Sequence, residues 1–158
     1  MRAYLSQSRN GFSIELALHA IIEPDVNPND ASAGQGPEAV IFADREGVIR
    51  YWGGAAESVF GHSVADALGA SLDLIIPERF RRAHWDAYDK AIESGLTKYD
   101  GRVLTTRSMR KDGGKLYVEL SFLLVKDARA AVLGALATGR DCTTRYLAER
   151  QQREQSMQ

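Results

Sequence analysis

The stretch AVIFADREGVIRYW, residues 39–52, decides the fold class of this chain. It holds two apolar runs, 39–43 and 48–52, on either side of the polar sequence Asp44-Arg-Glu-Gly47. Short runs rich in β-branched and aromatic residues that flank an Asp- and Gly-containing turn are typical of a β-hairpin. We therefore expect the folded domain to begin with two antiparallel strands.

The segments that follow change from a strand period to a helical one. Residues 55–60 and 63–68 each have the length of a short helix, and Gly61 and Gly69 stand where a left-handed C-cap would end them. The pattern in residues 77–95 predicts a longer helix, because it opens with a proline and ends at a glycine. Three- and four-residue spacing predicts an inward face made of Phe80, His84, Ala87, Tyr88, Ala91 and Ile92.

Three further strand-like runs follow, at residues 101–109, 116–126 and 131–141. The middle run alternates strictly, which predicts one buried face formed by Leu116, Val118, Leu120, Phe122 and Leu124. Two strands, several helices and three more strands predict an α+β domain with an antiparallel sheet.

The two ends of the chain differ from this core. Residues 1–37 are expected to form a helix and a linker, and the Pro-, Gly- and Asn-rich residues 23–37 are the linker. The helix is expected at residues 12–22, although Ile14, Leu16 and Leu18 would also alternate as a strand. We therefore divide the chain into residues 1–37, a domain at 38–141, and a polar helical tail at 142–158.

Composition excludes several classes of protein. Among 158 residues, 20 Lys and Arg against 21 Asp and Glu leave no bulk attraction for nucleic acid or for an anionic membrane. A single cysteine, Cys142, excludes an internal disulfide and any metal site built from several thiolates. No apolar run approaches the ~18 residues needed to span a bilayer. We expect a soluble cytoplasmic protein that binds neither nucleic acid nor membrane, and no motif indicates an enzyme.

Several short motifs occur in a characteristic order. They are Asp44-Arg-Glu-Gly47, residues 56–61 (AESVFG) followed by 67–69 (ALG), residues 74–79 (LIIPER), residues 110–113 (RKDG) and residues 139–143 (GRDCT). In this order they resemble a PAS domain, a small sensory and interaction module of signalling proteins. The resemblance implies a five-stranded sheet of order 2-1-5-4-3 with helices on one face, and a ligand pocket between helix and sheet. It also implies that the C-terminal helix relays a signal to a partner.

The run RFRRAHWDAY, residues 79–88, resembles more particularly the haem-binding PAS domains of bacterial oxygen sensors. That resemblance implies haem b with His84 as its axial iron ligand, and propionates paired with Lys90 and Lys98. Leu104 takes the strand position of the distal arginine in the oxygen-sensing kinases. A leucine cannot donate a hydrogen bond to bound oxygen, so CO, NO or a second protein ligand such as Met109 would be favoured.

A helix of this kind is also similar to PAS domains that hold no haem, so three functions stay open. The first is a haem-based gas or redox sensor that uses His84. The second is a sensor of a small organic ligand, bound between His84 and Tyr88 on the helix and Leu104, Leu120 and Phe122 on the strands. The third is a ligand-free interaction module that forms a homodimer. In each case residues 12–22 and 142–158 are expected to carry the contact to a second copy or to a downstream signalling protein.

The remaining candidate residues are expected to be structural. Trp52 and Trp85 are predicted to pack in the core or against it, and Cys142 to be a small packing residue. His19 and His62 are predicted to be solvated, because neither shares a face with His84.

Overall fold

The structure is a computed structural model that describes residues 38–97 and 102–158. The helix expected at 12–22, the linker at 23–37, His19 and Lys98 lie outside the described residues. In chain order the elements are β1 (Ala39–Asp44), β2 (Ile49–Gly54), α2 (Ala56–Phe60), α3 (Val64–Ala67), the 3-10 helix η1 (Leu72–Leu74), α4 (Glu78–Ser94), β3 (Val103–Met109), β4 (Lys115–Lys126), β5 (Val132–Asp141) and α5 (Thr143–Ser156).

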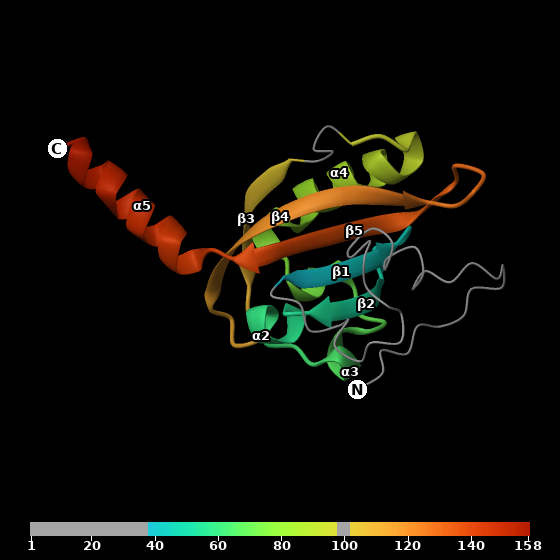
Figure 1. The fold of residues 1–158 in the computed structure, drawn as a ribbon, viewed down its shortest axis with the longest axis horizontal. Helices are drawn as coiled ribbons and strands as arrows, with labels where there is room; N and C mark the ends of the chain where they lie inside the picture. Colours follow the sequence, from blue (N-terminus) through green and yellow to red (C-terminus); the bar gives the residue numbers. More distant parts are fainter. Residues whose placement is uncertain (1–37, 98–101) are drawn as a thin grey trace, which may run out of the picture.

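The five strands form one antiparallel sheet of order β2-β1-β5-β4-β3, which confirms the expected topology (Figure 1). The hairpin between β1 and β2 has a local cause. The Asp44 carboxylate accepts the backbone N–H groups of Glu46 and Val48, and Gly47 has a left-handed φ of 76°. Such side-chain bonds to the backbone favour turns, and only glycine adopts this φ without strain.

Helices α2 and α4 end at the glycines that the sequence predicts, whereas α3 does not, because its C-cap is Leu68 in an extended conformation and Gly69 follows it with a φ of 84°. The Ser63 hydroxyl accepts the Asp66 amide at the start of α3, and Gly61 and Gly95 end α2 and α4 with φ values of 80° and 67°. The 3-10 helix η1 has no counterpart in the prediction, because three residues are too few to show a period.

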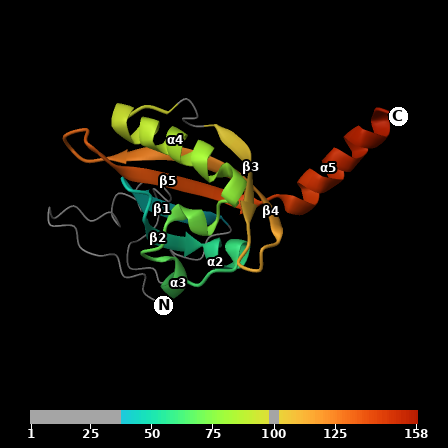
Figure 2. The same ribbon diagram turned by 180° about the vertical axis from the view of Figure 1, so that it is seen from behind.

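Helices α2, α3 and α4 lie against one face of the sheet, which we call the inner face (Figure 2). Trp52 and Phe60 pack there with ring centroids 5.4 Å apart, and both side chains are almost fully buried. The inward side of β4 is the predicted one, since Leu116, Val118 and Leu120 are buried. The opposite, outer face of the sheet carries a second buried cluster.

Helix α5 leaves the sheet and projects away from the domain (Figure 1). None of its residues is buried, and the exposed Met157 directly follows its last turn. The tail is therefore helical, as its polar composition predicted. None of the described helices is long and apolar enough to cross a membrane.

Candidate functional site

The candidate site lies where α4 faces the inner side of the sheet. Pro77 precedes the helix and Gly95 ends it, as expected. The half-buried side chains on its inward side are those of His84, Trp85 and Tyr88, and Ile92 is buried. The prediction that Phe80 and Ala87 also face inward is wrong, because both are exposed. The helix is rotated so that the large indole of Trp85, rather than these residues, fills the space above the sheet.

Trp85 fixes this rotation through two contacts. Its indole Nε1 donates a hydrogen bond to the Asp73 carboxylate at 2.8 Å. Its ring lies over Gly47, where an added Cβ atom would come within 2.1 Å of the indole Cη2. Gly47, in the turn of the first hairpin, therefore also contacts α4 through the ring of Trp85.

Tyr88 forms a second anchor between α4 and the sheet. Its hydroxyl donates to the backbone carbonyls of Ala43 and Asp44, at the end of β1. Burial, with the nearby Asp44 carboxylate, raises the pKa of the Tyr88 hydroxyl above its usual range. The hydroxyl therefore stays protonated and is engaged with the backbone, so only the ring of Tyr88 can face a ligand.

His84 lies between these two anchors. Its ring centroid is 4.8 Å from that of Trp85, in an edge-on arrangement, and 5.7 Å from that of Tyr88. Its Nδ1 atom is buried and has no hydrogen-bond partner in the part of the chain that the structure describes. Burial lowers the pKa of His84 below 6.5, although Asp73 and Asp89 oppose the shift. The ring is consequently neutral at physiological pH, and a buried polar atom left unpaired costs about 1–3 kcal/mol.

The strand residues predicted for the site come together on the inner face. Leu104 of β3 is directly opposite Leu120 of β4, and Phe122 is opposite Ala137 of β5. Leu120 is buried, whereas Leu104 and Phe122 are half-buried. Leu120 and Phe122 belong to the core of the inner face, and Leu104 is on the same side of the sheet as its pairing partner Leu120.

Met109 does not join this surface. Side chains alternate along a strand, so Met109, five residues beyond Leu104, shares the other face with its pairing partner Lys115. Ser108, the residue before it, is the one that points inward, and its hydroxyl donates to the Ile75 carbonyl at 2.6 Å. The expectation that Met109 could serve as a second axial ligand is therefore wrong.

Lys90 lies on α4 two residues beyond Tyr88 and is exposed. Because it is exposed, Lys90 could pair with an anionic group of a ligand only at the protein surface, and it does not line a buried pocket. Its pairing with a propionate stays a prediction.

His62 is the residue that sequence reasoning misjudged. The side chain is 8% exposed and its Nε2 atom is buried without a hydrogen-bond partner in residues 38–97 and 102–158, so the expectation of a solvated loop histidine is wrong. The indole Nε1 of Trp52 donates to the His62 carbonyl at 3.0 Å, which draws the loop between α2 and α3 onto the core. Burial lowers the pKa of His62, and the nearby Lys111 adds to the shift while Asp66 opposes it. No local pattern around Gly61 signals this burial.

These two histidines predict an acid-sensitive fold. Both have pKa values below 6.5 in the folded chain, so the unfolded chain binds more protons in mildly acidic solution. The stability that they contribute is present above the unfolded pKa and is lost as the pH falls through the folded pKa. We expect urea midpoints to fall between about pH 7.5 and about pH 5.5. His62→Gln and His84→Gln, measured singly and together, should flatten this dependence. If the pH dependence of the urea midpoint is unchanged in the double variant, the two histidines are not its cause and the prediction is contradicted.

The site is connected to α5 through the other side of β4. The rings of Tyr117 and Tyr146 stack with centroids 4.1 Å apart, and Glu119 pairs with Arg145. Side chains alternate along a strand, so Leu120 points to the inner face of the sheet, whereas Glu119, the residue before it, points to the opposite face and pairs with Arg145 in the first turn of α5. A displacement of β4 on the inner face would therefore move the base of α5.

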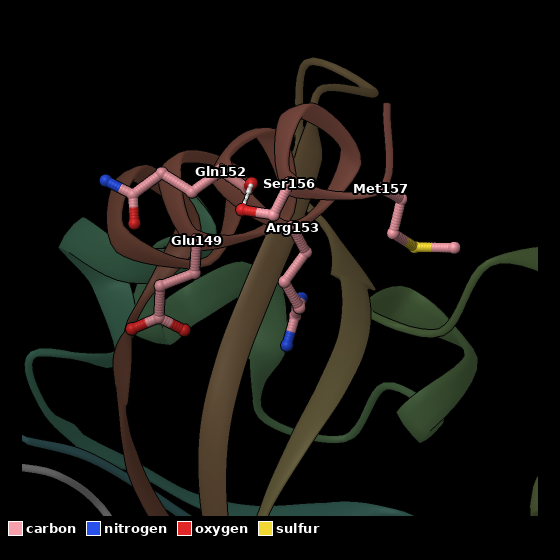
Figure 3. Close-up of a pocket in the computed structure, with 5 residues that line it drawn as sticks. All are labelled: Glu149, Gln152, Arg153, Ser156 and Met157. Carbon is pink, nitrogen blue, oxygen red and sulfur yellow. Dashed lines mark hydrogen bonds between the residues drawn. The ribbon is translucent and has the colours of Figure 1, made fainter.

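A shallow depression on α5 is not part of this site. Its lining residues are Glu149, Gln152, Arg153, Ser156 and Met157, which all come from the projecting helix (Figure 3). The Ser156 hydroxyl donates to the Gln152 carbonyl within the same helix. A single helix cannot enclose a ligand, so we assign no function to this surface.

The sheet and α4 together correspond to a known protein family. The model of the PAS fold family matches residues 34–147, which is most of the chain. The chain belongs to the PAS family. The match begins just before β1 and ends within α5, so it includes the whole sheet and α4.

Two curated relatives of this PAS domain are oxygen or other sensor proteins by name. The sensor protein FixL of Bradyrhizobium diazoefficiens is 33% identical over 91 residues, which cover 54% of this chain and 17% of FixL. The oxygen sensor protein DosP of Escherichia coli is 28% identical over 120 residues, which cover 76% of this chain and 14% of DosP. The chain therefore spans less than a fifth of the length of either relative.

A solved PAS domain shows the same fold at lower identity. The RpfR quorum-sensing receptor PAS domain of Cronobacter turicensis, in complex with C12:0, superposes with a TM-score of 0.55 and 13% identity. The superposition covers 68% of this chain and 95% of that domain. This PAS domain is thus distantly related in sequence to the sensor proteins FixL and DosP, and it shares its fold with the PAS domain of RpfR.

Proposed function

We propose that this PAS domain binds a small ligand between α4 and the inner face of the sheet, with the His84 imidazole as its main polar contact. The observation that carries the proposal is the buried Nδ1 atom of His84, which has no hydrogen-bond partner among the described residues. A buried polar atom without a partner is costly, and a ligand atom would supply the missing bond. Trp85, whose ring is beside that of His84, and Leu104 and Phe122 on the inner face of the sheet would provide the apolar surface that such a ligand needs.

Haem fits this donor set in its chemistry. An iron ligand must be a neutral imidazole with a free lone pair, and burial keeps His84 in that form. Leu104, Leu120 and Phe122 would face the porphyrin, and Lys90 is exposed at the margin where a propionate would emerge. When bound, haem would supply an iron centre that binds diatomic gases. The likeness to FixL and DosP supports haem over other ligands.

The expected signal route runs from β4 to α5. A ligand that presses on Leu120 and Phe122 would shift the strand that holds Tyr117 and Glu119, and with them the first turn of α5. We further propose that α5, together with residues 12–22, carries this change to a second copy of the chain or to a downstream signalling protein.

The test is a visible absorption spectrum of the purified full chain, before and after haemin is added. We expect a sharp Soret band that His84→Ala abolishes, because no other histidine is placed to replace it on α4. The matched control is His62→Gln, which alters the other buried histidine and should leave the band intact. Circular dichroism of each variant verifies that it is folded.

The outcomes separate the functions directly. A band lost only in His84→Ala supports haem binding through this residue. The absence of a band, or a band indifferent to His84, would rule haem out. Small organic ligands, with C12:0 among the probes, would then be screened by their effect on thermal stability, with His84→Ala as the control. If no ligand stabilises the protein, the ligand-free dimerisation module is the function that remains.

A further inference from the structure

Strand β3 is the last strand of the sheet, with β4 as its single neighbour among the described strands (Figure 2). We call its other side the free edge. The pairing of β3 with β4 has no register shift, whereas the pairs β1–β2 and β4–β5 each contain one. Proteins commonly block the unpaired backbone groups of an edge strand with a bulge, a proline or a covering segment. Strand β3 has neither a bulge nor a proline.

One hydrogen bond determines which residues of β3 turn their backbone to the free edge. The Met109 N–H donates to the Ile75 carbonyl at 3.2 Å, so it points away from β4. Backbone groups alternate in direction along an antiparallel strand. The N–H and C=O groups of Val103, Thr105 and Arg107 therefore also point to the free edge, and within the described residues they have no hydrogen-bond partner.

The opposite edge of the sheet is partly closed. The Ile49 N–H of β2 donates to the Ala70 carbonyl at 2.8 Å, and the Ile49 carbonyl accepts the Gly69 N–H at 2.9 Å. The loop after α3 thus covers the start of β2. No described segment does the same for residues 103–107 of β3, and the Val103 side chain is 62% exposed.

The free edge is also basic. Residues 102–111 contain Arg102, Arg107, Arg110 and Lys111 and no acidic residue. Arg110 and Lys111 pair with aspartates of other segments. Within the described part of the chain, the guanidinium groups of Arg102 and Arg107 have no carboxylate partner, although Arg102 is exposed and Arg107 half-buried. Two positive charges at the free edge are therefore not neutralised.

The Arg107 side chain is held in place beside the free edge. Its guanidinium lies over the ring of Tyr117, 5.4 Å from the centroid, and its Nε donates to the Ser108 carbonyl at 3.2 Å. The remaining four N–H donors of the guanidinium are on its two Nη atoms. A guanidinium that is already oriented loses less entropy when its Nη atoms bind a carboxylate.

We propose that the free edge of β3 binds an extended acidic segment of a partner protein, which adds a sixth strand antiparallel to β3. Val103, Thr105 and Arg107 would each exchange two backbone hydrogen bonds with the residue opposite. One carboxylate opposite Arg107 and another opposite Arg102 would be five residues apart in the partner. This edge is separate from the ligand site beneath α4, and the proposal does not depend on what binds there.

A second copy of this chain does not suit the free edge. Two β3 strands in antiparallel contact would bring together four arginines, Arg102 and Arg107 of each copy, with no acidic residue on either strand. Like charges on neighbouring strands disfavour pairing. An acidic partner would convert the same charges into an attraction, so the charge of the edge selects the partner.

Fluorescence anisotropy of a labelled octapeptide, titrated with the full chain, tests the proposal. The probe is Ser-Glu-Thr-Val-Thr-Val-Glu-Ser, whose two glutamates are five residues apart, and its matched control has lysine in place of both glutamates. We expect the acidic peptide to bind roughly tenfold more tightly than the lysine peptide, and more weakly as the salt concentration rises. A third peptide, with proline in place of the first valine, should not bind, because it lacks the N–H that would face Thr105.

Substitutions in the chain test the same contacts from the other side. The double substitution Arg102→Glu and Arg107→Glu should reverse the preference, so that the lysine peptide binds more tightly than the acidic one. Thr105→Pro removes an N–H group at the free edge and should abolish binding. The domain should stay folded, because an edge strand tolerates proline where its N–H faces solvent. Circular dichroism verifies the fold of each variant, and the charge reversal remains decisive if Thr105→Pro does not fold.

The other outcomes overturn the proposal. Equal binding of the acidic and the lysine peptide, or binding of neither, would show that the free edge does not select an acidic strand. Light scattering reports the oligomeric state of the chain. A dimer that Thr105→Pro converts to a monomer would show that a second copy occupies the edge.

Discussion

Trp52→Ala is expected to lower the free energy of unfolding by about 3–5 kcal/mol, which is a large part of the stability of a small domain. The indole is 1% exposed and packs on Phe60, so its loss leaves a cavity between the sheet and α2. Its Nε1 also donates to the His62 carbonyl, so the loop between α2 and α3 loses its anchor. Urea unfolding, followed by circular dichroism, measures the change.

The control for Trp52→Ala is Arg50→Ala, two residues earlier in β2. The Arg50 side chain is 46% exposed and its ion pair with Asp44 is near the surface, so we expect a loss below about 1 kcal/mol. Equal losses for the two substitutions would mean that the inner core does not depend on Trp52. Because the defect lies outside the ligand site, an added ligand should raise the thermal midpoint of Trp52→Ala by about as much as it raises that of the unsubstituted protein.

Gly47→Ala is the second large effect, and it tests how the hairpin positions α4. Gly47 has a φ of 76°, which costs any residue with a Cβ atom roughly 1–2 kcal/mol. The new methyl group would also lie 2.1 Å from Cη2 and 2.2 Å from Cζ3 of Trp85, so the indole must move. Since Trp85 is next to His84, we expect weaker ligand binding as well as lower stability.

A double-mutant cycle isolates this contact. Trp85→Phe replaces the indole with a shorter ring that does not reach Gly47. In that background Gly47→Ala should lower the free energy of unfolding only through the strain of its left-handed backbone conformation. The difference from its effect in the presence of Trp85 is the coupling energy, which we expect to be about 0.5–3 kcal/mol. Urea unfolding of the four proteins provides the numbers. Strict additivity would show that α4 does not rest on the hairpin turn.

Most of the fold could be predicted because its signals are local. The Asp44 turn, the alternation along β4 and the glycines that end α2 and α4 each act within a few residues. The order of the strands came instead from the resemblance to PAS domains, since no residue spacing states which strands are neighbours. The sequence-based prediction of strand order was confirmed for this reason and not by periodicity.

The candidate site was predicted less completely. Tyr88, Leu120 and Phe122 pack in the core of the inner face and Leu104 pairs with Leu120, whereas the part of these residues and of His84 in binding a ligand stays a prediction. The role of the Tyr88 hydroxyl could not be foreseen, because its partners are backbone carbonyls of Ala43 and Asp44, more than 40 residues earlier.

The amino-acid sequence by itself determined the elements, their amphipathic sides and the position of one histidine on the longest helix, because these follow from periods of two and of about 3.6 residues and from caps. Tertiary structure decided how α4 is rotated, since Trp85 fits over Gly47 and Phe80 has no such place. It also decided that His62 is buried under Trp52 and that Met109 faces away from His84. Each of these depends on contacts between distant segments, and the free energy of such contacts is not encoded in any local pattern.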